Sequence, residues 1–203
     1  MSLIALGSNL PSQTAGAPES TLRAALRMMH AEQNISIHDV SEFWLSAALP
    51  SGSGPDYCNA VASVVSDLHP QELLALLHDI EFRFGRSREN GLRWRSRPLD
   101  LDLLAVGDLI LPDADTQDDW RILPAELQAL RAPETLILPH PRLQDRGFVL
   151  APLAQIAPDW RHPRTGRSVA EMLADLPRDL MDGLRPLGLT SAPARTTTPS
   201  PHP

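Results

Sequence analysis

Residues 97–104 read Arg97-Pro98-Leu99-Asp100-Leu101-Asp102-Leu103-Leu104, an apolar run that two carboxylates interrupt. The leucines predict a largely buried strand, and residues two apart on a strand point to the same face. The two carboxylates are therefore expected side by side. Like charges held together need a compensating cation, and hard carboxylate oxygens suit Mg²⁺. Taken alone, the same pair is also compatible with two solvated aspartates on an edge strand.

The neighbouring residues set this stretch in a mixed fold. We expect its strand to run over 99–106, and the turn at Gly107-Asp108 to lead into a partner strand at 109–111. Other segments predict strands over 3–6, 35–45 and 57–65, and helices over 18–31, 70–84, 144–155 and 168–176. Strands and helices alternate, but the hairpin-like neighbours favour an antiparallel α+β sandwich over a doubly wound parallel sheet.

Length and composition indicate one domain. We expect it to cover residues 1–189, with an insertion at about 112–133 that carries a short helix at 124–130, and a disordered Pro/Thr/Ser-rich tail at 190–203. No stretch is long and apolar enough for a transmembrane helix, and the N-terminus lacks the basic region of a signal peptide. The single cysteine, Cys58, excludes an internal disulfide and is expected to be an inert buried thiol. These features predict a cytoplasmic protein.

The basic residues are unevenly distributed. The formal net charge is −7, yet six of the 18 basic residues, all of which are arginine, fall within residues 83–97, where only Glu89 opposes them. Arginine holds phosphate through its planar fork. An arginine cluster directly before an acidic pair is what phosphoryl transfer requires, namely cations for phosphate and carboxylates for Mg²⁺. The chain has neither a Walker A loop nor the motifs of protein kinases, so it falls outside those classes.

Four further residues are candidates for a site. His140 lies between two prolines, which constrain the backbone around it. Tyr57 and Asn59 share one face of a predicted strand, where an aromatic ring and an amide can bind a flat heterocycle. Phe148 follows Arg146-Gly147. Each also has a purely structural interpretation: a surface turn for the histidine, packing of a sheet face on a helix for the pair, and core packing for the phenylalanine.

Together these motifs resemble the 6-hydroxymethyl-7,8-dihydropterin pyrophosphokinase family of folate biosynthesis. The matching stretches are Ala5–Leu10, Pro55–Ala60, Gly85–Arg86 through Arg93–Trp94, Arg97–Leu104, Leu138–Arg142 and Asp145–Leu153. The resemblance implies a ferredoxin-like α+β fold with a central antiparallel sheet. It implies transfer of the β,γ-pyrophosphoryl group of ATP to the pterin hydroxymethyl oxygen, with release of AMP.

The resemblance also implies roles for individual residues. Asp100 and Asp102 would bind two Mg²⁺ ions, and Arg86 and Arg97 would act with them in catalysis by gripping phosphates. The pterin would contact Ser46, Leu49, Tyr57, Asn59 and Phe148; ATP would contact Glu81, Arg88, Trp94, Leu103, His140 and Arg146, with Arg88 and Trp94 on a loop that closes over it. The chain departs from the family pattern at Ala47-Ala48 and at Arg95-Ser96.

Two alternative functions stay open at this point. A relic of the family would bind pterin and nucleotide without transfer, and an arginine-rich loop with Trp94 could bind single-stranded nucleic acid. The acidic net charge and the carboxylates beside the loop argue against nucleic acid. We therefore expect ATP and the pterin as partners, with no nucleic acid, no membrane and no obligate protein partner.

Overall fold

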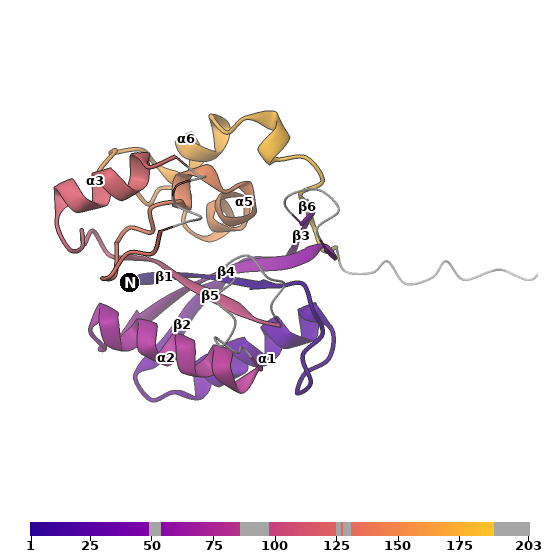
Figure 1. The fold of residues 1–203 in the computed structure, drawn as a ribbon. Coiled ribbons are helices and arrows are strands. Elements are labelled where there is room, and N and C mark those ends of the chain that lie inside the picture. Colours follow the sequence, from indigo (N-terminus) through magenta and orange to yellow (C-terminus); the bar gives the residue numbers. More distant parts are fainter. Residues whose placement is uncertain (49–53, 86–97, 125–126, 128–130, 189–203) are drawn as a thin grey trace, which may run out of the picture.

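The computed structural model describes residues 1–48, 54–85, 98–124, 127 and 131–188 (Figure 1). The strands are β1 (Ser2–Ser8), β2 (Ile35–Val40), β3 (Trp44–Ser46), β4 (Tyr57–Ser66), β5 (Asp100–Val106) and β6 (Arg185–Pro186). The helices are α1 (Pro18–Ala31), α2 (Pro70–Arg83), α3 (Ala114–Ile122), α5 (Gly147–Ile156) and α6 (Val169–Ala174), with 3₁₀ turns η1 (Leu143–Asp145) and η2 (Arg178–Leu180).

The strands form one antiparallel sheet in the order β5-β1-β4-β3-β6, with β2 also paired to β4. β2 and β3 follow one another along the same edge of β4, β2 beside its C-terminal half and β3 beside its first three residues. All pairings between these strands are antiparallel. The expected α+β class is therefore confirmed.

Helices cover both faces of the sheet (Figure 1). α1 and α2 pack on one face, while α5 and α6 lie on the opposite face, on the same side as α3. Strand alternation produces two cores: Ile4 of β1 belongs to the cluster with α1 and α2, and its neighbour Leu3 belongs to the cluster with α5 and α6. The sheet is thus buried on both sides, which explains why β4 is buried continuously from Cys58 to Val64 and is mostly apolar there.

The leucines of β5 determine where its aspartates point. Leu101 and Leu103 belong to the core beneath β5, with α1 and α2. Asp100 and Asp102 alternate with them and therefore face the α5 side. A register shift after these residues leaves Leu104 opposite no residue of β1, and Leu104 joins the second core. The acidic pair thus lies at the end of β5 that precedes this bulge.

Three local expectations were wrong. β5 pairs with β1 rather than with residues 109–111, and Leu111 instead bridges Leu138. The strand expected over 35–45 is two strands, because the regular pairing with β4 is interrupted at Ser41–Phe43 and resumes at Trp44. The insertion holds a helix, α3, that was not expected. The short helix expected at 124–130 lies largely outside the described residues.

Within the part of the chain that the structure describes, no helix is long and apolar enough to cross a membrane.

Candidate active site on the α5 face of the sheet

The acidic pair lies opposite the start of α5. Arg146, the N-cap residue of α5, donates a hydrogen bond from Nη1 to Oδ2 of Asp102 over 3.2 Å. Both side chains are partly exposed, at 23% and 34% respectively, so a ligand can reach the pair. The guanidinium of Arg146 also lies 5.7 Å from the centre of the Phe148 ring. One cation therefore connects the carboxylates with the aromatic residue on the first turn of α5.

The donor set at this point fits Mg²⁺ that is shared with a phosphate ligand. Over the described ranges no cluster of three or more His, Cys, Asp or Glu side chains suitable for a metal is found. A closed protein cage is thus not formed by those residues. Mg²⁺ typically takes one or two carboxylates and fills its other positions with water and substrate phosphates. Asp100 and Asp102, on one strand face and partly exposed, match that pattern.

A strip of sheet surface at Gly7, where no side chain projects, separates the acidic pair from Asn59. Gly7 of β1 pairs with Asp100 on one side and with Asn59 of β4 on the other. Two strand spacings amount to about 10 Å between the outer Cα atoms. A Cβ on Gly7 would lie 3.6 Å from Oδ1 of Asn59 and 4.0 Å from Cβ of Asp100. The missing side chain therefore leaves open surface between the amide and the carboxylates.

Asn59 is held with its oxygen toward this strip. Its Nδ2 donates to Ser46 Oγ over 2.9 Å and, at 3.5 Å, to the Trp44 carbonyl. The amide is 4% exposed, and its partners require the nitrogen on the β3 side. Oδ1 is left on the Gly7 side as an acceptor. Ser46 thus orients Asn59.

Two aromatic residues come from elements that pack together. Tyr57 begins β4 and pairs with Ser46, while Phe148 lies on α5, which packs against β4. Both side chains are partly exposed. This arrangement can present ring faces to a flat ligand on the same side of the sheet as Asn59.

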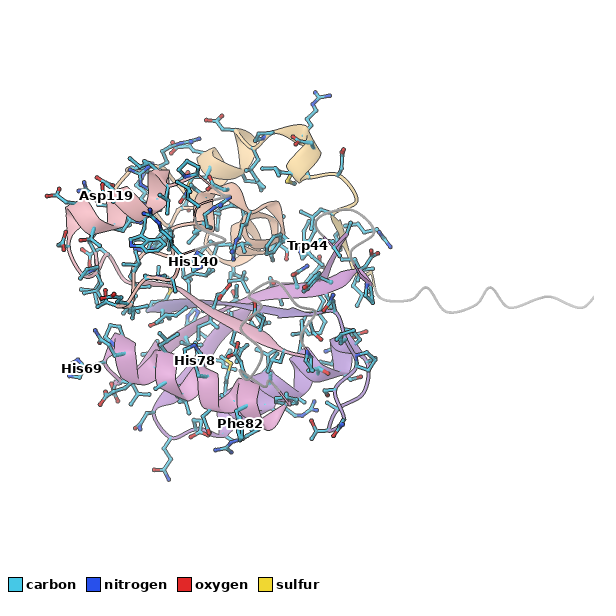
Figure 2. All side chains as sticks on the ribbon, in the orientation of Figure 1. Trp44, His69, His78, Phe82, Asp119 and His140 are labelled. Carbon is cyan, nitrogen blue, oxygen red and sulfur yellow. The ribbon has the colours of Figure 1, made fainter. Side chains whose placement is uncertain are left out.

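His140 lies above β5 on the same side of the sheet as α5 (Figure 2). Its backbone N–H donates to the Leu104 carbonyl over 2.7 Å, and its Nδ1 accepts from the Arg142 N–H over 3.1 Å. Burial, reinforced by the nearby Arg146 guanidinium, lowers the pKa of His140 to about 3. The ring is therefore neutral at pH 7 with its proton on Nε2, and it can donate one directed hydrogen bond.

Glu81 and Leu103 lie on the other side of β5. Glu81 is fully buried on α2, and its Oε1 accepts from the Leu101 N–H over 2.8 Å. The Leu103 side chain is 3% exposed within the α1–α2 core. The structure does not bring either side chain to the acidic pair.

Five other predicted site residues lie outside the described residues: Leu49, Arg86, Arg88, Trp94 and Arg97.

Ser8 and Asn9 tie the end of β1 to two other segments, which sequence reasoning missed. Ser8 Oγ donates to the Pro98 carbonyl over 2.6 Å, just before β5, and Asn9 Nδ2 donates to the Pro55 carbonyl over 3.3 Å, just before β4. The three strands that carry Gly7, Asn59 and Asp100 are thereby fastened at the same end. A Ser-Asn pair at the end of a buried strand was the available signal.

Gln155 near the end of α5 was also missed. Its Oε1 accepts from the Glu42 N–H over 3.0 Å and from Trp44 Nε1 over 3.2 Å, and its Nε2 donates to Glu42 Oε2 over 3.0 Å. These bonds hold β3 against α5, at the position of Trp44 in Figure 2. The partners are more than 110 residues apart in sequence, so no local pattern reveals them.

Comparison with known proteins places the chain in a family. The family model described as 7,8-dihydro-6-hydroxymethylpterin-pyrophosphokinase matches residues 3–158. A 2-amino-4-hydroxy-6-hydroxymethyldihydropteridine pyrophosphokinase of Pseudomonas aeruginosa is 36% identical over 174 residues, which cover 86% of this chain and 90% of that protein. One of the same name from Synechocystis sp. is 33% identical over 171 residues, covering 84% and 73%.

Solved structures support the fold. The wild-type HPPK-DHPS of Plasmodium falciparum superimposes with a TM-score of 0.56 at 12% identity, covering 85% of this chain. A triple mutant of that protein gives a TM-score of 0.59 at 13% identity. This chain spans less than half the length of those chains, 44% and 45% respectively.

Proposed function

Because this chain belongs to the 7,8-dihydro-6-hydroxymethylpterin-pyrophosphokinase family, we propose a role for each described site residue in that family's reaction. The enzyme transfers a pyrophosphoryl group from ATP to the hydroxymethyl oxygen of 6-hydroxymethyl-7,8-dihydropterin, giving the pterin diphosphate and AMP in folate biosynthesis. The observation that carries our assignment is the row Asn59–Gly7–Asp100 across three paired strands. It provides a recognition amide and an acidic pair at the two ends of one open strip.

In our proposal the pterin ring stacks between Tyr57 and Phe148, and Asn59 Oδ1 accepts a hydrogen bond from its edge. Ser46 contributes by holding the Asn59 amide, from which it accepts a hydrogen bond. Gly7 leaves room for the hydroxymethyl arm to extend over the sheet toward Asp100. The substrate oxygen would then lie beside the acidic pair, because Asp100 is the neighbour of Gly7 on the β5 side of the row.

We assign two Mg²⁺ ions to Asp100 and Asp102, with substrate and triphosphate oxygens as their other ligands. Bound Mg²⁺ would neutralise the triphosphate and favour ionisation of the hydroxyl group. Arg146 contacts Asp102 in this structure and can turn its remaining donors to phosphate. His140 offers Nε2–H to a phosphate oxygen. Such transfer depends on positioning and charge neutralisation rather than on a covalent nucleophile.

The rest of the ATP site is also a proposal. Arg86, Arg88, Trp94 and Arg97 come from the arginine-rich stretch and would close over the nucleotide. Glu81 and Leu103 line β5 from below, so any contact of Leu103 with the nucleoside would come from its main chain. We further propose a cytoplasmic location, with which a buried free thiol at Cys58 is compatible.

The test is AMP formation from ATP, Mg²⁺ and 6-hydroxymethyl-7,8-dihydropterin. Asp102→Asn preserves shape but removes a charge that the metal needs, so turnover should fall by about a thousandfold or more. Its melting temperature without metal should change little. The ion pair between Asp102 and Arg146 is partly exposed, and such ion pairs contribute little to stability. Asp108→Asn, on the exposed turn after β5, is the matched control and should keep full turnover. Near-normal turnover in Asp102→Asn would contradict the assignment of Mg²⁺ to Asp102.

A further inference from the structure

The insertion places a buried amide directly against the His140 segment. Gln117 lies in the middle of α3 and is fully buried, the only residue of that helix that is. We infer that Gln117 is a positioning residue, which holds the main chain at Pro139 so that His140 points its ring at the ATP phosphates. This inference rests on the phosphate role proposed for His140.

The contact has a defined direction. Gln117 Nε2 donates to the Pro139 carbonyl over 3.1 Å, between residues 22 apart in sequence. A carbonyl oxygen can only accept, so only the amide nitrogen of Gln117 makes a favourable bond at this point. This hydrogen bond is buried. Replacing Gln117 by a residue without a donor therefore leaves the Pro139 carbonyl without this hydrogen bond, at a position that water reaches poorly.

Other elements hold the same segment from the opposite side. The N–H of His140 donates to the Leu104 carbonyl of β5 over 2.7 Å. Leu138 and Leu111 exchange two backbone hydrogen bonds, at 2.9 and 3.1 Å. His140 is therefore fixed between β5 and the insertion, and Gln117 supplies the bond from α3.

α3 is itself anchored from behind. Asp118, the neighbour of Gln117, accepts hydrogen bonds from Arg164 and, over 2.8 Å, from Arg121. These two guanidinium groups hold the pKa of Asp118 well below its usual range. The Arg164 N–H in turn donates to Nδ1 of the buried His162 over 3.2 Å. The helix thus has a fixed position from which Gln117 can act, and Figure 2 shows Asp119 of α3 and His140 in the same layer above β5.

The chemistry of His140 makes its position matter. A neutral imidazole gives one hydrogen bond, whose strength falls steeply with angle, whereas an arginine attracts phosphate from many directions. The ring has only Nε2 to offer to phosphate, because its Nδ1 accepts a hydrogen bond from the Arg142 N–H. A small rotation of the Pro139–His140 backbone therefore weakens the contact with phosphate.

The experiment is a double-mutant cycle on steady-state kinetics. Gln117→Met keeps length and apolar packing but removes the donor, and should raise KM for ATP about fivefold, the loss of roughly one hydrogen bond. KM for the pterin should stay within about twofold, because its proposed contacts lie elsewhere. In a His140→Ala background, Gln117→Met should have little further effect on KM for ATP, since Gln117 acts through the His140 ring.

Val169→Ala, in the core at the start of α6, controls for lost stability and should leave KM for ATP unchanged.

Gln117→Glu gives a second variant of the same size, in which the loss of the donor depends on pH. Its ionised carboxylate cannot donate to Pro139, but the protonated form can, so KM for ATP should recover as the pH is lowered, unlike in the native enzyme. Unchanged KM for ATP in both Gln117 variants, or effects of Gln117→Met and His140→Ala that simply add, would overturn the inference while leaving the role of His140 intact. If His140→Ala itself left KM for ATP unchanged, the phosphate role would fail and the inference with it.

Discussion

Gly7 shows how a missing side chain can define a site. The space above it is bounded by Asn59 Oδ1 and Asp100 Cβ, both at ordinary van der Waals distance from the position that a Cβ would take. Gly7→Val should therefore fold, since a β-branched residue suits a strand, but its branches would occupy the path of the hydroxymethyl arm. We expect transfer to fall by about tenfold or more, with a smaller loss for Gly7→Ala. AMP formation and the melting temperature, measured together, check this. A large drop in stability with Gly7→Val would instead make the glycine a packing requirement.

Phe148 tests the aromatic part of the site. Stacking on an aromatic face contributes about 1 kcal/mol, so Phe148→Ala should weaken pterin binding by roughly fivefold to tenfold and leave ATP binding nearly unchanged. Phe82→Ala is the control, because Phe82 is 72% exposed on α2, on the other side of the sheet (Figure 2). Calorimetric titration with each ligand gives both affinities. Equal losses for ATP and pterin would mean that Phe148 only supports the packing of α5.

At the scale of elements, the start of α5 is held by the chain that follows α6. A Cβ on Gly147 would lie 2.4 Å from the Leu180 carbonyl oxygen of η2, closer than such atoms approach. Gly147→Ala must therefore displace η2 or α5, and we expect it to lower stability by about 1–3 kcal/mol. Gly188→Ala is the matched control, because no atom lies within 4 Å of its added methyl group. Urea denaturation of the two variants provides the comparison, and equal midpoints would show that the backbone yields at little cost.

The edge of the sheet is completed by the same C-terminal chain. β6 pairs with β3, and the Leu187 N–H donates to the Phe43 carbonyl over 2.6 Å. β3 is therefore held by β6 along one edge, by β4 along the other, and by Gln155 from α5. Since β3 carries Ser46, which orients Asn59, elements far apart in sequence jointly shape the proposed pterin site.

At the scale of the whole molecule, two histidines with lowered pKa values predict acid sensitivity. Burial lowers the pKa of His140 to about 3 and that of His162 to about 4, in both cases with a further contribution from a nearby arginine. In the unfolded chain both titrate near their ordinary pKa of about 6.5, so between that pH and about 4 the unfolded state binds more protons. Stability should be complete above pH 6.5 and decline as the pH falls.

Melting temperatures between pH 8 and pH 4.5 measure this decline. His162→Asn keeps an acceptor for the Arg164 N–H but does not titrate, so its decline over the same range should be shallower. The groups around His162 are Asp118, Arg121 and Arg164, and Asp118 stays ionised throughout the range because its pKa is strongly lowered. An equally steep decline in His162→Asn would assign the effect to other groups.

Sequence alone predicted the elements whose signals are local. α1 has the expected bounds, Pro18–Ala31, because a proline at its start and apolar residues at helical spacing are both visible in the chain. α3 was missed although Asp113 caps it, because only one of its residues is buried and it has no apolar stripe. β6 was missed because a two-residue strand has no pattern of its own.

For the site, the sequence determined which residues share a face, since period-two alternation fixes this within any strand: Asp100 with Asp102, and Tyr57 with Asn59. What lies next to these residues depends on contacts between elements. The pairing register places Gly7 between Asn59 and Asp100, and packing of the insertion brings Gln117 to Pro139. Neighbours within an element follow from backbone geometry. Neighbours between elements depend on the burial and hydrogen bonding of segments far apart in sequence, such as Ser8 with Pro98 and Glu42 with Gln155.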